Sequence, residues 1–389
     1  MTAPRQDLPQ HDLLIVGAGP VGLALALALK NSGLDIVLAD ARPQGAADAD
    51  PRVLALAHGT RQTLERLGVW AGLPATPIKT IHVSQQGGLG RTLLQATDYD
   101  IAALGYVAPA GALAAALRKE VEQAGIAILN DTEVRALEAQ ADRIVATLET
   151  PDGSRSLSAR LAACAEGGMQ AGDGDIAERD YGQHALIAYV DVAGGHNSTA
   201  FERFTTQGPL ALLPCGNRYA VVHAASPAEA DRLMALDDAT YLARVQAHIG
   251  NRVQLTAVAE RLRYPLGLRY RREPAGVRTA WLGNAAQTLH PVAGQGFNLA
   301  LRDVWALAEA LLARGGDPGA PATLADYTRN RRLDRLGTIR FTDTLVRLFS
   351  NDIAPLRHLR GAGLVALDLF PPLRHFVAKR MMFGARAWP

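Results

Sequence analysis

The first forty residues contain the pattern that most restricts the fold of this chain. An apolar run from Leu13 to Val16 leads directly into glycines with the spacing Gly-x-Gly-x-x-Gly. An alanine- and leucine-rich segment typical of a helix follows, and then a second apolar run ends at Asp40. Strand, glycine turn, helix, strand and acid in this order are typical of the first βαβ unit of a dinucleotide-binding fold. The sequence therefore predicts an α/β domain with a parallel sheet.

The residues of this fingerprint have distinct expected roles. Gly17 makes the turn, Gly19 lets a pyrophosphate approach the backbone, and Gly22 lets the helix pack on the strand. Asp40 is expected to accept hydrogen bonds from the ribose hydroxyls of an adenosine. We predict nucleotide binding at this turn, Pro20 included. The alternative is a glycine-rich turn of an α/β protein that binds nothing.

A second glycine-rich segment, residues 283–298, lies far downstream. It follows a short predicted strand, and a helix is expected to begin near Gly296. Gly294 and Gly296 allow close approach of a ligand, and a helix start offers unpaired N–H groups with partial positive charge. Such a turn suits an anion or an electron-rich heterocycle. Together with the first motif, it predicts a second wall of one nucleotide site.

Composition excludes several classes of protein. The two cysteines, Cys164 and Cys215, provide no disulfide framework and fit a reducing cytoplasm. Neither they nor the histidines have metal-ligand spacing, so we expect no metal site. Residues 13–29 are uncharged, but their glycines occupy the fingerprint positions. We therefore expect neither an export signal nor a membrane-spanning helix.

Charge is unevenly distributed along the chain. From Arg329 to the C-terminus there are 12 basic and 4 acidic residues, together with the apolar stretch 364–373. A basic, partly amphipathic terminus fits a surface that lies on an anionic bilayer or docks an acidic partner, or else a solvated helical cap. No nucleic-acid-binding motif accompanies the charge, so we expect no nucleic-acid partner.

The intervening chain is expected to alternate between two domains. Residues 143–163 predict a β-hairpin with Asp152-Gly153 in its turn, and residues 180–222 are rich in strand-forming residues. Residues 228–248 and 297–313 have helical periodicity. We predict a discontinuous nucleotide-binding domain (1–75, 100–170 and 265–330), a β-rich substrate domain (76–99 and 171–264) and a basic helical region (331–389).

Several segments together resemble one known family. They are the fingerprint glycines and residues 50–57, 64–70, 180–183, 283–298 and 359–380. With them, essentially the full chain resembles flavin-dependent aromatic hydroxylases of the p-hydroxybenzoate hydroxylase fold, most of all the ubiquinone-biosynthesis hydroxylases of the UbiH/UbiF/VisC type. The resemblance implies an α/β fold with an α+β insert. In that fold a Rossmann-type FAD-binding domain is interleaved with a β-sheet substrate domain, and a C-terminal helical region follows.

The resemblance also implies a reaction. FAD would be the cofactor, NAD(P)H and O2 the co-substrates, and a polyprenylated phenol of ubiquinone biosynthesis the substrate. The electron-rich phenol ring would attack a flavin hydroperoxide, while the protein positions the ring and excludes water. Backbone N–H groups of residues 294–297 would stabilise the negative charge of reduced flavin. We expect a cytoplasmic protein whose basic C-terminus contacts the inner face of the membrane or a biosynthetic complex. A homo-oligomer is compatible with this expectation.

Residue roles follow from the same resemblance. Pro291 would wall the space beside the reactive flavin carbon, with His290 and Gln295 as further catalytic candidates. His290 is alternatively a structural hydrogen-bonder, and Tyr181 and Gln183 either face the substrate or brace the sheet. Besides the fingerprint residues, the expected cofactor contacts are Arg52, Glu166, Gly283, Asn284, Gly294, Gln295, Gly296, Phe297 and Asn298. Arg52 would lie near the flavin and its pyrophosphate, or form a plain salt bridge.

Two departures from the family pattern are evident. The family's middle motif, Ala-Asp-Gly-x-x-Ser with a later arginine, has Glu166 here, Gln170 in place of the serine and Asp173 in place of the arginine. Asn284 replaces an aspartate that accepts from the flavin ribityl chain, a loss of about 1 kcal/mol. We expect FAD binding to survive, and use of NAD(P)H to be the function most affected. Two alternatives remain: a hydroxylase of a soluble aromatic compound, or a degenerate flavoprotein that serves as a non-catalytic subunit.

Overall fold

The computed structural model describes residues 10–88, 90–169, 175–349 and 354–387. Gln170 and Asp173, two positions of the altered middle motif, lie outside these residues. Within them, no helix is both long enough and apolar enough to cross a membrane.

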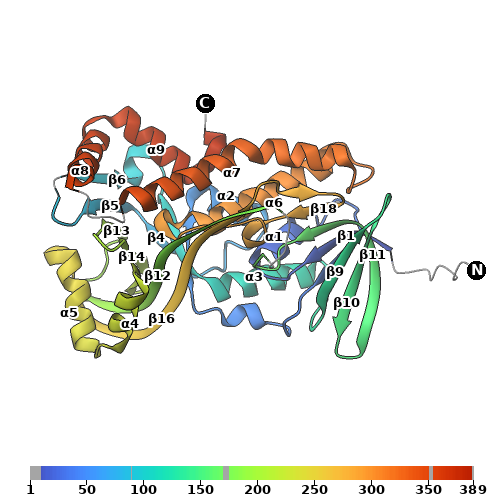
Figure 1. Ribbon diagram of the computed structural model, residues 1–389, viewed down its shortest axis with the longest axis horizontal. Helices are drawn as coiled ribbons and strands as arrows, with labels where there is room; N and C mark the ends of the chain where they lie inside the picture. Colours follow the sequence, from blue (N-terminus) through green and yellow to red (C-terminus); the bar gives the residue numbers. More distant parts are fainter. Residues whose placement is uncertain (1–9, 89, 170–174, 350–353, 388–389) are drawn as a thin grey trace, which may run out of the picture.

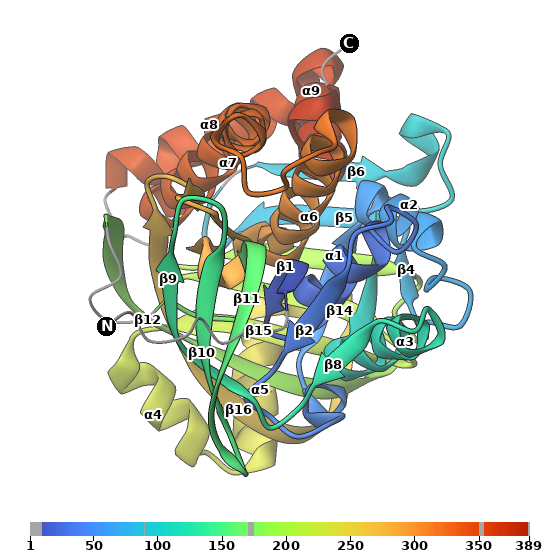
Figure 2. The same cartoon turned by 90° about the vertical axis from the view of Figure 1, so that its right-hand side faces the viewer.

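The first sheet contains the dinucleotide turn. Its strands lie in the order β17-β18-β11-β1-β2-β8, and most of them form a row in Figure 2. The central strand β1 (Gln10–Val16) pairs in parallel with β2 (Ile36–Ala39) and with β11 (Gly153–Cys164). The outer members are β8 (Ala127–Leu129), β18 (Thr279–Trp281) and β17 (Ala275–Gly276). Leu13, Leu14 and Ile15 are completely buried, as expected for a strand covered on both faces.

The predicted hairpin extends this sheet. Strand β10 (Ile144–Thr150) pairs antiparallel with β11 and with β9 (Glu133–Ala139), and the three project away from the rest of the molecule (Figure 1). Helices α1 (Pro20–Ala28), α3 (Ala110–Gln123) and α6 (Gln295–Arg314) contribute to one apolar core with β1 and β2.

The second sheet has the order β19-β16-β12-β15-β14-β13-β5-β6. Strands β12 (Ile176–Ala193) and β16 (Gln254–Arg271) are the longest and cross between the two halves of the molecule (Figure 1). The others are β5 (Thr80–Gln85), β6 (Arg91–Gln95), β13 (Thr199–Phe204), β14 (Pro209–Cys215), β15 (Arg218–Ala225) and β19 (Gln287–Thr288). Helices α4 (Pro227–Ala235) and α5 (Asp238–Ile249) help form its core.

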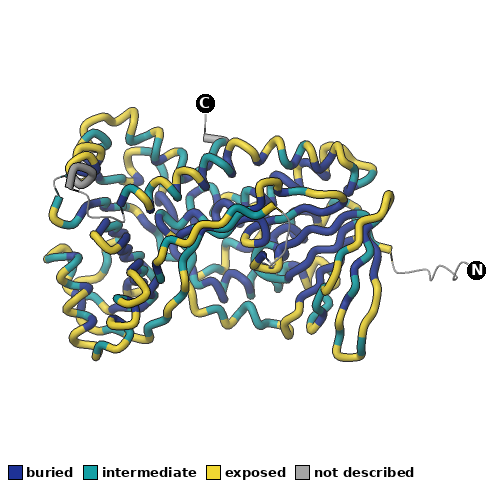
Figure 3. Tube along the Cα trace, in the orientation of Figure 1, coloured by how far each residue is buried: buried dark blue, intermediate teal, exposed yellow. Residues whose placement is uncertain are grey.

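A small sheet and four helices complete the fold. The small sheet joins β3 (Val53–Ala57), β7 (Gly105–Pro109) and β4 (Thr76–Ile78), and α2 (His58–Arg66) follows β3. The long helix α7 (Pro321–Phe349) packs against α6, and α8 (Ala354–Leu369) and α9 (Pro371–Phe383) follow it. Figure 3 shows buried strands inside the molecule and a largely exposed α8. The predicted mixed architecture, with segments of two sheets alternating along the chain and helices at the C-terminus, is confirmed.

Candidate active site

The fingerprint glycines differ in what surrounds them. A Cβ atom at Gly17 would lie 2.7 Å from the carbonyl oxygen of Ala165, and one at Gly22 only 1.9 Å from that of Gly17. Packing therefore requires glycine at both positions. At Gly19 the nearest atom, in the Arg42 guanidinium, is 3.8 Å away. The backbone at Gly19 is thus open to a ligand, as the approach of a pyrophosphate requires.

Asp40 is held beside this turn by the backbone and by an arginine. Its Oδ2 accepts the Ala18 N–H at 2.7 Å, and the Arg42 guanidinium donates to both carboxylate oxygens at 2.8 and 2.9 Å. Burial raises the pKa of Asp40, but the hydrogen bonds from Arg42 and Ala18 outweigh it and leave the pKa below its ordinary value. Ribose binding by Asp40 stays a prediction. Arg42, which no motif in the sequence singled out, stands two residues after Asp40 and places a half-exposed cation beside the turn.

Three motifs that are distant in sequence meet at this point. A Cβ atom at Gly283 would lie 3.1 Å from the Val21 side chain in α1 and 3.4 Å from that of Ala300 in α6. One at Gly17 would lie 2.8 Å from the Cα of Glu166. The fingerprint, the altered middle motif and the second glycine turn therefore form one junction. Asn284 and Glu166 are exposed there.

Asn298 fixes the loop that precedes α6. Ala293 and Gly294 both have φ of 59°. The Asn298 amide donates to the carbonyls of Ala55 at 2.9 Å and Gly294 at 2.6 Å, and its oxygen accepts from the Ala57 N–H and the Thr60 hydroxyl. These four bonds use the full capacity of the side chain. Asn298, expected to contact the cofactor, thus braces the loop against β3 with its side chain.

The rest of the loop leaves room for a ligand. An added Cβ at Gly296 would have no atom within 4 Å, and Pro291 is exposed. Gln295 is buried and donates to the Ala293 carbonyl at 3.2 Å, while Phe297 packs partly against the core. With the open backbone at Gly19 and the exposed Asn284, these residues fit a flavin dinucleotide laid across the junction. Arg52 is exposed and pairs with Asp50 at 2.6 Å, so its contact with the cofactor stays a prediction.

His290 is 1% exposed and lies directly before Pro291. Its Nδ1 accepts the Val292 N–H at 3.1 Å, which assigns the proton to Nε2. Within the described residues, Nε2 has no hydrogen-bond partner. Burial lowers the pKa of His290 to about 4. At neutral pH His290 is therefore a neutral hydrogen-bond donor and a poor proton acceptor.

Tyr181 connects His290 to a carboxylate that sequence analysis missed. The two rings meet edge-on with centroids 5.7 Å apart. The Tyr181 hydroxyl donates to Asp343 of α7 at 3.0 Å, and Arg179 donates to both oxygens of the same carboxylate at 2.9 Å. Burial and the neighbouring Asp343 raise the pKa of Tyr181 well above its ordinary value. No local pattern links Tyr181 with Asp343, because they belong to a strand and a helix far apart in sequence.

A cavity of about 430 Å³ opens beside Tyr181. Gln183 also lines it, and within the described residues its buried Oε1 has no partner, while its amide donates to the Gln207 carbonyl at 2.6 Å. An apolar cluster of Phe204, Val292, Val346 and Phe349 packs against Tyr181. Its other lining residues are Arg179, Asp180, Val346 and Arg347, so polar groups converge on it and Val346 links it to the apolar cluster. Polar groups that converge on a cavity beside apolar surface are features of a substrate site.

A buried ionic network supports the second glycine turn. Asp303 of α6 accepts from the Gly283 N–H at 3.3 Å and from the Gln287 amide at 2.6 Å, and it pairs with Arg331 of α7 at 2.7 Å. Arg335 donates to the Gln287 amide oxygen at 2.6 Å. Gln287 is therefore the link between α7 and the turn. These residues were not predicted from the sequence, although charged residues within a largely apolar helical stretch were a signal for them.

Comparisons with known proteins agree with this geometry. The family model described as FAD binding domain matches residues 10–341. The ubiquinone hydroxylase UbiL of Rhodospirillum rubrum is 36% identical, over 97% of this chain and 91% of the relative. The 3-demethoxyubiquinol 3-hydroxylase of Escherichia coli is 29% identical, over 92% of this chain and 94% of the relative.

Solved structures show the same fold. The p-nitrophenol 4-monooxygenase PnpA of Pseudomonas putida superposes with a TM-score of 0.77 at 17% identity, over 97% of this chain and 100% of that chain. PqsL of Pseudomonas aeruginosa, in complex with 2-aminobenzoylacetate, gives 0.74 at 22% identity, over 92% of this chain and 99% of that chain. The chain therefore belongs to the FAD-binding domain family and is a flavin-dependent monooxygenase.

Proposed function

We propose that this enzyme hydroxylates the aromatic ring of a polyprenylated phenol in ubiquinone biosynthesis, with NAD(P)H as electron donor. The observation that supports it most is the cavity beside Tyr181, because Tyr181 and the lining residue Val346 pack with Val292 of the cofactor loop in one apolar cluster. The names of the ubiquinone hydroxylases similar to this chain support the same substrate class. Bound FAD supplies the activation of O2 that delivers one oxygen atom to the ring.

The residues of the chain have separate tasks in this proposal. The fingerprint turn and the exposed Asn284 hold the cofactor, and Pro291 walls the substrate space. His290, buried and neutral, packs edge-on against Tyr181 and helps to position that ring. Tyr181 holds a hydrogen bond to Asp343, and we infer that this carboxylate accepts the phenol proton through Tyr181. The apolar cluster keeps water away from the reacting ring.

A hydroxylase of a soluble carboxylated aromatic is the second candidate, because Arg179 and Arg347 line the cavity. Both guanidinium groups, however, face Asp343, at 2.9 and 4.0 Å. A carboxylated substrate would have to compete with that carboxylate. The prenylated phenol is therefore favoured.

The test is a visible spectrum of the purified protein, followed by anaerobic NADPH with and without a prenylphenol analogue. A flavin spectrum that bleaches faster with the phenol supports the proposal. Faster bleaching with a carboxylated phenol but not with the prenylphenol analogue contradicts the substrate assignment. Oxidation of NADPH without a hydroxylated product once O2 is admitted contradicts it as well. Failure to take up FAD at all would favour a non-catalytic subunit.

We also propose that the corner between α8 and α9 contacts the anionic inner face of the cytoplasmic membrane. Leu369 and Phe370 are 68% and 61% exposed, and Leu373 and Phe376 are exposed nearby. The exposed Lys379 follows in α9. Exposed apolar side chains beside basic ones are typical of interfacial membrane contacts. Such a contact would deliver a lipid substrate to the enzyme.

Vesicle flotation tests this contact. The native protein should float with vesicles that contain phosphatidylglycerol, and the double variant Leu369→Glu, Phe370→Glu should not. Leu333→Glu, an exposed position on α7, is the matched control and should float like the native protein. Equal loss in both variants, or no flotation of the native protein, contradicts the proposal.

A further inference from the structure

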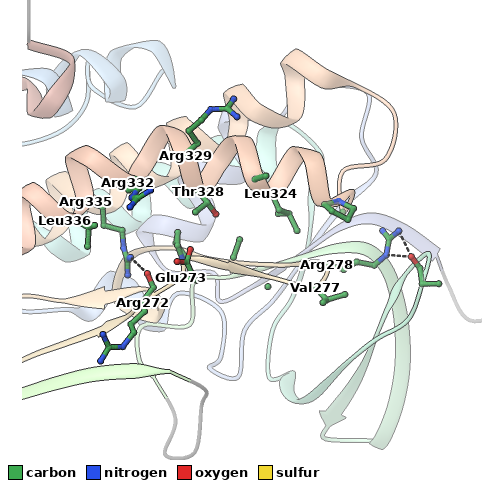
Figure 4. A pocket seen from close by; sticks show the side chains of 17 residues that line it. Arg272, Glu273, Val277, Arg278, Leu324, Thr328, Arg329, Arg332, Arg335 and Leu336 are labelled. Atoms are coloured by element: carbon green, nitrogen blue, oxygen red, sulfur yellow. Dashed lines mark hydrogen bonds between the residues drawn. The ribbon is translucent and has the colours of Figure 1, made fainter.

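A second cavity, of about 810 Å³, lies away from the residues assigned to the substrate. One wall is the segment 272–278 between β16 and β18, and the other is the first half of α7. Among the lining residues that the structure describes, five are arginines and one, Glu273, carries a carboxylate. Figure 4 shows Arg335 reaching from α7 to the backbone of Arg272, with Arg332 nearby.

Three of the five guanidinium groups have carboxylate partners. Arg278 forms a bidentate pair with Asp317 at 2.8 and 3.0 Å. Arg329 pairs with Asp326, and Arg272 pairs with Asp175 at 2.8 Å. Arg332 is exposed and makes no hydrogen bond or ion pair with any residue that the structure describes. Its positive charge is therefore available to a ligand.

Arg335 is a different case, because it is only 2% exposed. It donates to the Gln287 amide oxygen at 2.6 Å and to the carbonyls of Arg271 at 2.5 Å and Ala286 at 3.0 Å. All of these acceptors are neutral. Asp303 and Glu273 attract Arg335 without contacting it, and Asp303 makes its own ion pair with Arg331. A buried guanidinium without a contacting anion is costly, so the cavity favours a negatively charged occupant.

The other lining residues indicate which further chemical groups the ligand carries. Val277, Leu324 and Leu336 provide apolar surface, and the volume exceeds what a bare inorganic anion would fill. Guanidinium groups bind phosphate oxygens with paired N–H donors. Glu273 can accept hydrogen bonds from hydroxyl groups. We propose that this cavity binds a phosphate-bearing ligand with an apolar or heterocyclic body, through the free guanidinium of Arg332, with the positive charge of the buried Arg335 behind it. The headgroup of an anionic phospholipid and a free nucleotide share this chemistry.

The site is connected to the cofactor turn. Arg335 holds both Gln287 and the Ala286 carbonyl, and these residues follow directly after Asn284. An anion close to Arg335 would therefore alter the bonds that fix this turn. Binding should change the fluorescence or absorbance of bound flavin, which provides a readout that is independent of turnover.

Calorimetric titration of the FAD-saturated protein tests the proposal. Saturation with FAD prevents ADP from occupying the adenosine part of the cofactor site. The probes are inorganic phosphate, ADP and a short-chain phosphatidylglycerol below its micelle concentration. Arg332→Gln removes the free cation, and Arg340→Gln, an exposed arginine of α7 outside the cavity, is the matched control.

We expect ADP or the short-chain lipid to bind saturably and more tightly than inorganic phosphate. Arg332→Gln should weaken binding at least about tenfold, and Arg340→Gln by less than about twofold. The tighter of the two organic probes identifies the source of the phosphate. Absence of saturable binding by both organic probes overturns the proposal. Equal weakening by the two variants overturns it as well, because it would indicate attraction by general surface charge.

Discussion

Among single residues, Gly19 and Gly22 are glycines for different reasons. Gly22 is required by the fold, because any Cβ there would overlap the Gly17 carbonyl oxygen. Gly19 has open space around it, so its lack of a side chain matters only when a ligand is bound. Substitution separates the two roles.

Gly19→Ala should leave the folding of the flavin-free protein intact and weaken FAD binding. We expect the free energy of unfolding to change by less than about 0.5 kcal/mol. The dissociation constant for FAD should rise at least about tenfold, equivalent to about 1.4 kcal/mol. Urea denaturation and flavin-fluorescence titration measure the two quantities. An unchanged affinity would mean that the pyrophosphate does not pass over Gly19.

The burial of His290 should make the stability of the protein depend on pH. Because burial lowers its pKa from 6.5 to about 4, the folded state binds this proton more weakly than the unfolded state. The stability that the neutral His290 imidazole contributes to the folded state is therefore fully present above pH 6.5. It is lost as the pH falls towards 4. Between these limits the native protein should lose up to about 3 kcal/mol more stability than His290→Asn.

Urea denaturation across this pH range gives the comparison. The asparagine oxygen replaces Nδ1 as acceptor for the Val292 N–H, so the variant should fold. Burial also lowers the pKa of His223, to about 3, and that residue titrates in both proteins. The difference between the two profiles is therefore the informative quantity, and parallel profiles would contradict the assignment of a neutral buried imidazole.

Among the elements, α6 and α7 are joined by charges that are almost completely buried. Asp303, Arg331 and Asp334 are each less than 5% exposed. Arg331 lies between the two carboxylates, 2.7 Å from each. Removal of one member leaves its partner charged and desolvated. The network also holds the Gly283 N–H, so it couples helix packing to the cofactor turn.

Asp303→Asn should destabilise the protein by about 3 kcal/mol, because it leaves Arg331 and the Gln287 amide facing a poorer acceptor. Its FAD affinity should also fall, since the Gly283 turn loses support. Asp152→Asn, at an exposed pair in the hairpin turn, should change stability by less than about 0.5 kcal/mol. Chemical denaturation measures the free energy of unfolding of both variants. An equally small loss in the two would show that the buried network adds no stability.

In the whole molecule, the cofactor site is assembled from distant segments. The fingerprint, the loop held on β3 by Asn298 and the Gly283 turn meet only when the chain is folded. FAD should therefore bind the folded state and not the unfolded chain. At an FAD concentration about 100 times its dissociation constant, the stabilisation should be about 2.7 kcal/mol.

Denaturation with and without FAD measures this stabilisation, and riboflavin is the control. Riboflavin lacks the pyrophosphate and adenosine, so it cannot use the Gly19 turn. It should stabilise the protein much less than FAD at the same concentration. Equal stabilisation would mean that the fingerprint turn contributes nothing to binding.

The sequence by itself determined the βαβ unit, the hairpin, the second glycine turn and the family, because these depend on residues that are close in the chain. Periodicity and the stereochemistry of glycine are local properties. Only the tertiary structure decided the pairing of Tyr181 with Asp343, 162 positions apart, and of Asp303 with Arg331, 28 positions apart. It also decided that the Asn298 side chain braces a loop and that His290 is neutral. Hydrogen-bond partners and burial, which set these properties, arise only when distant segments pack together.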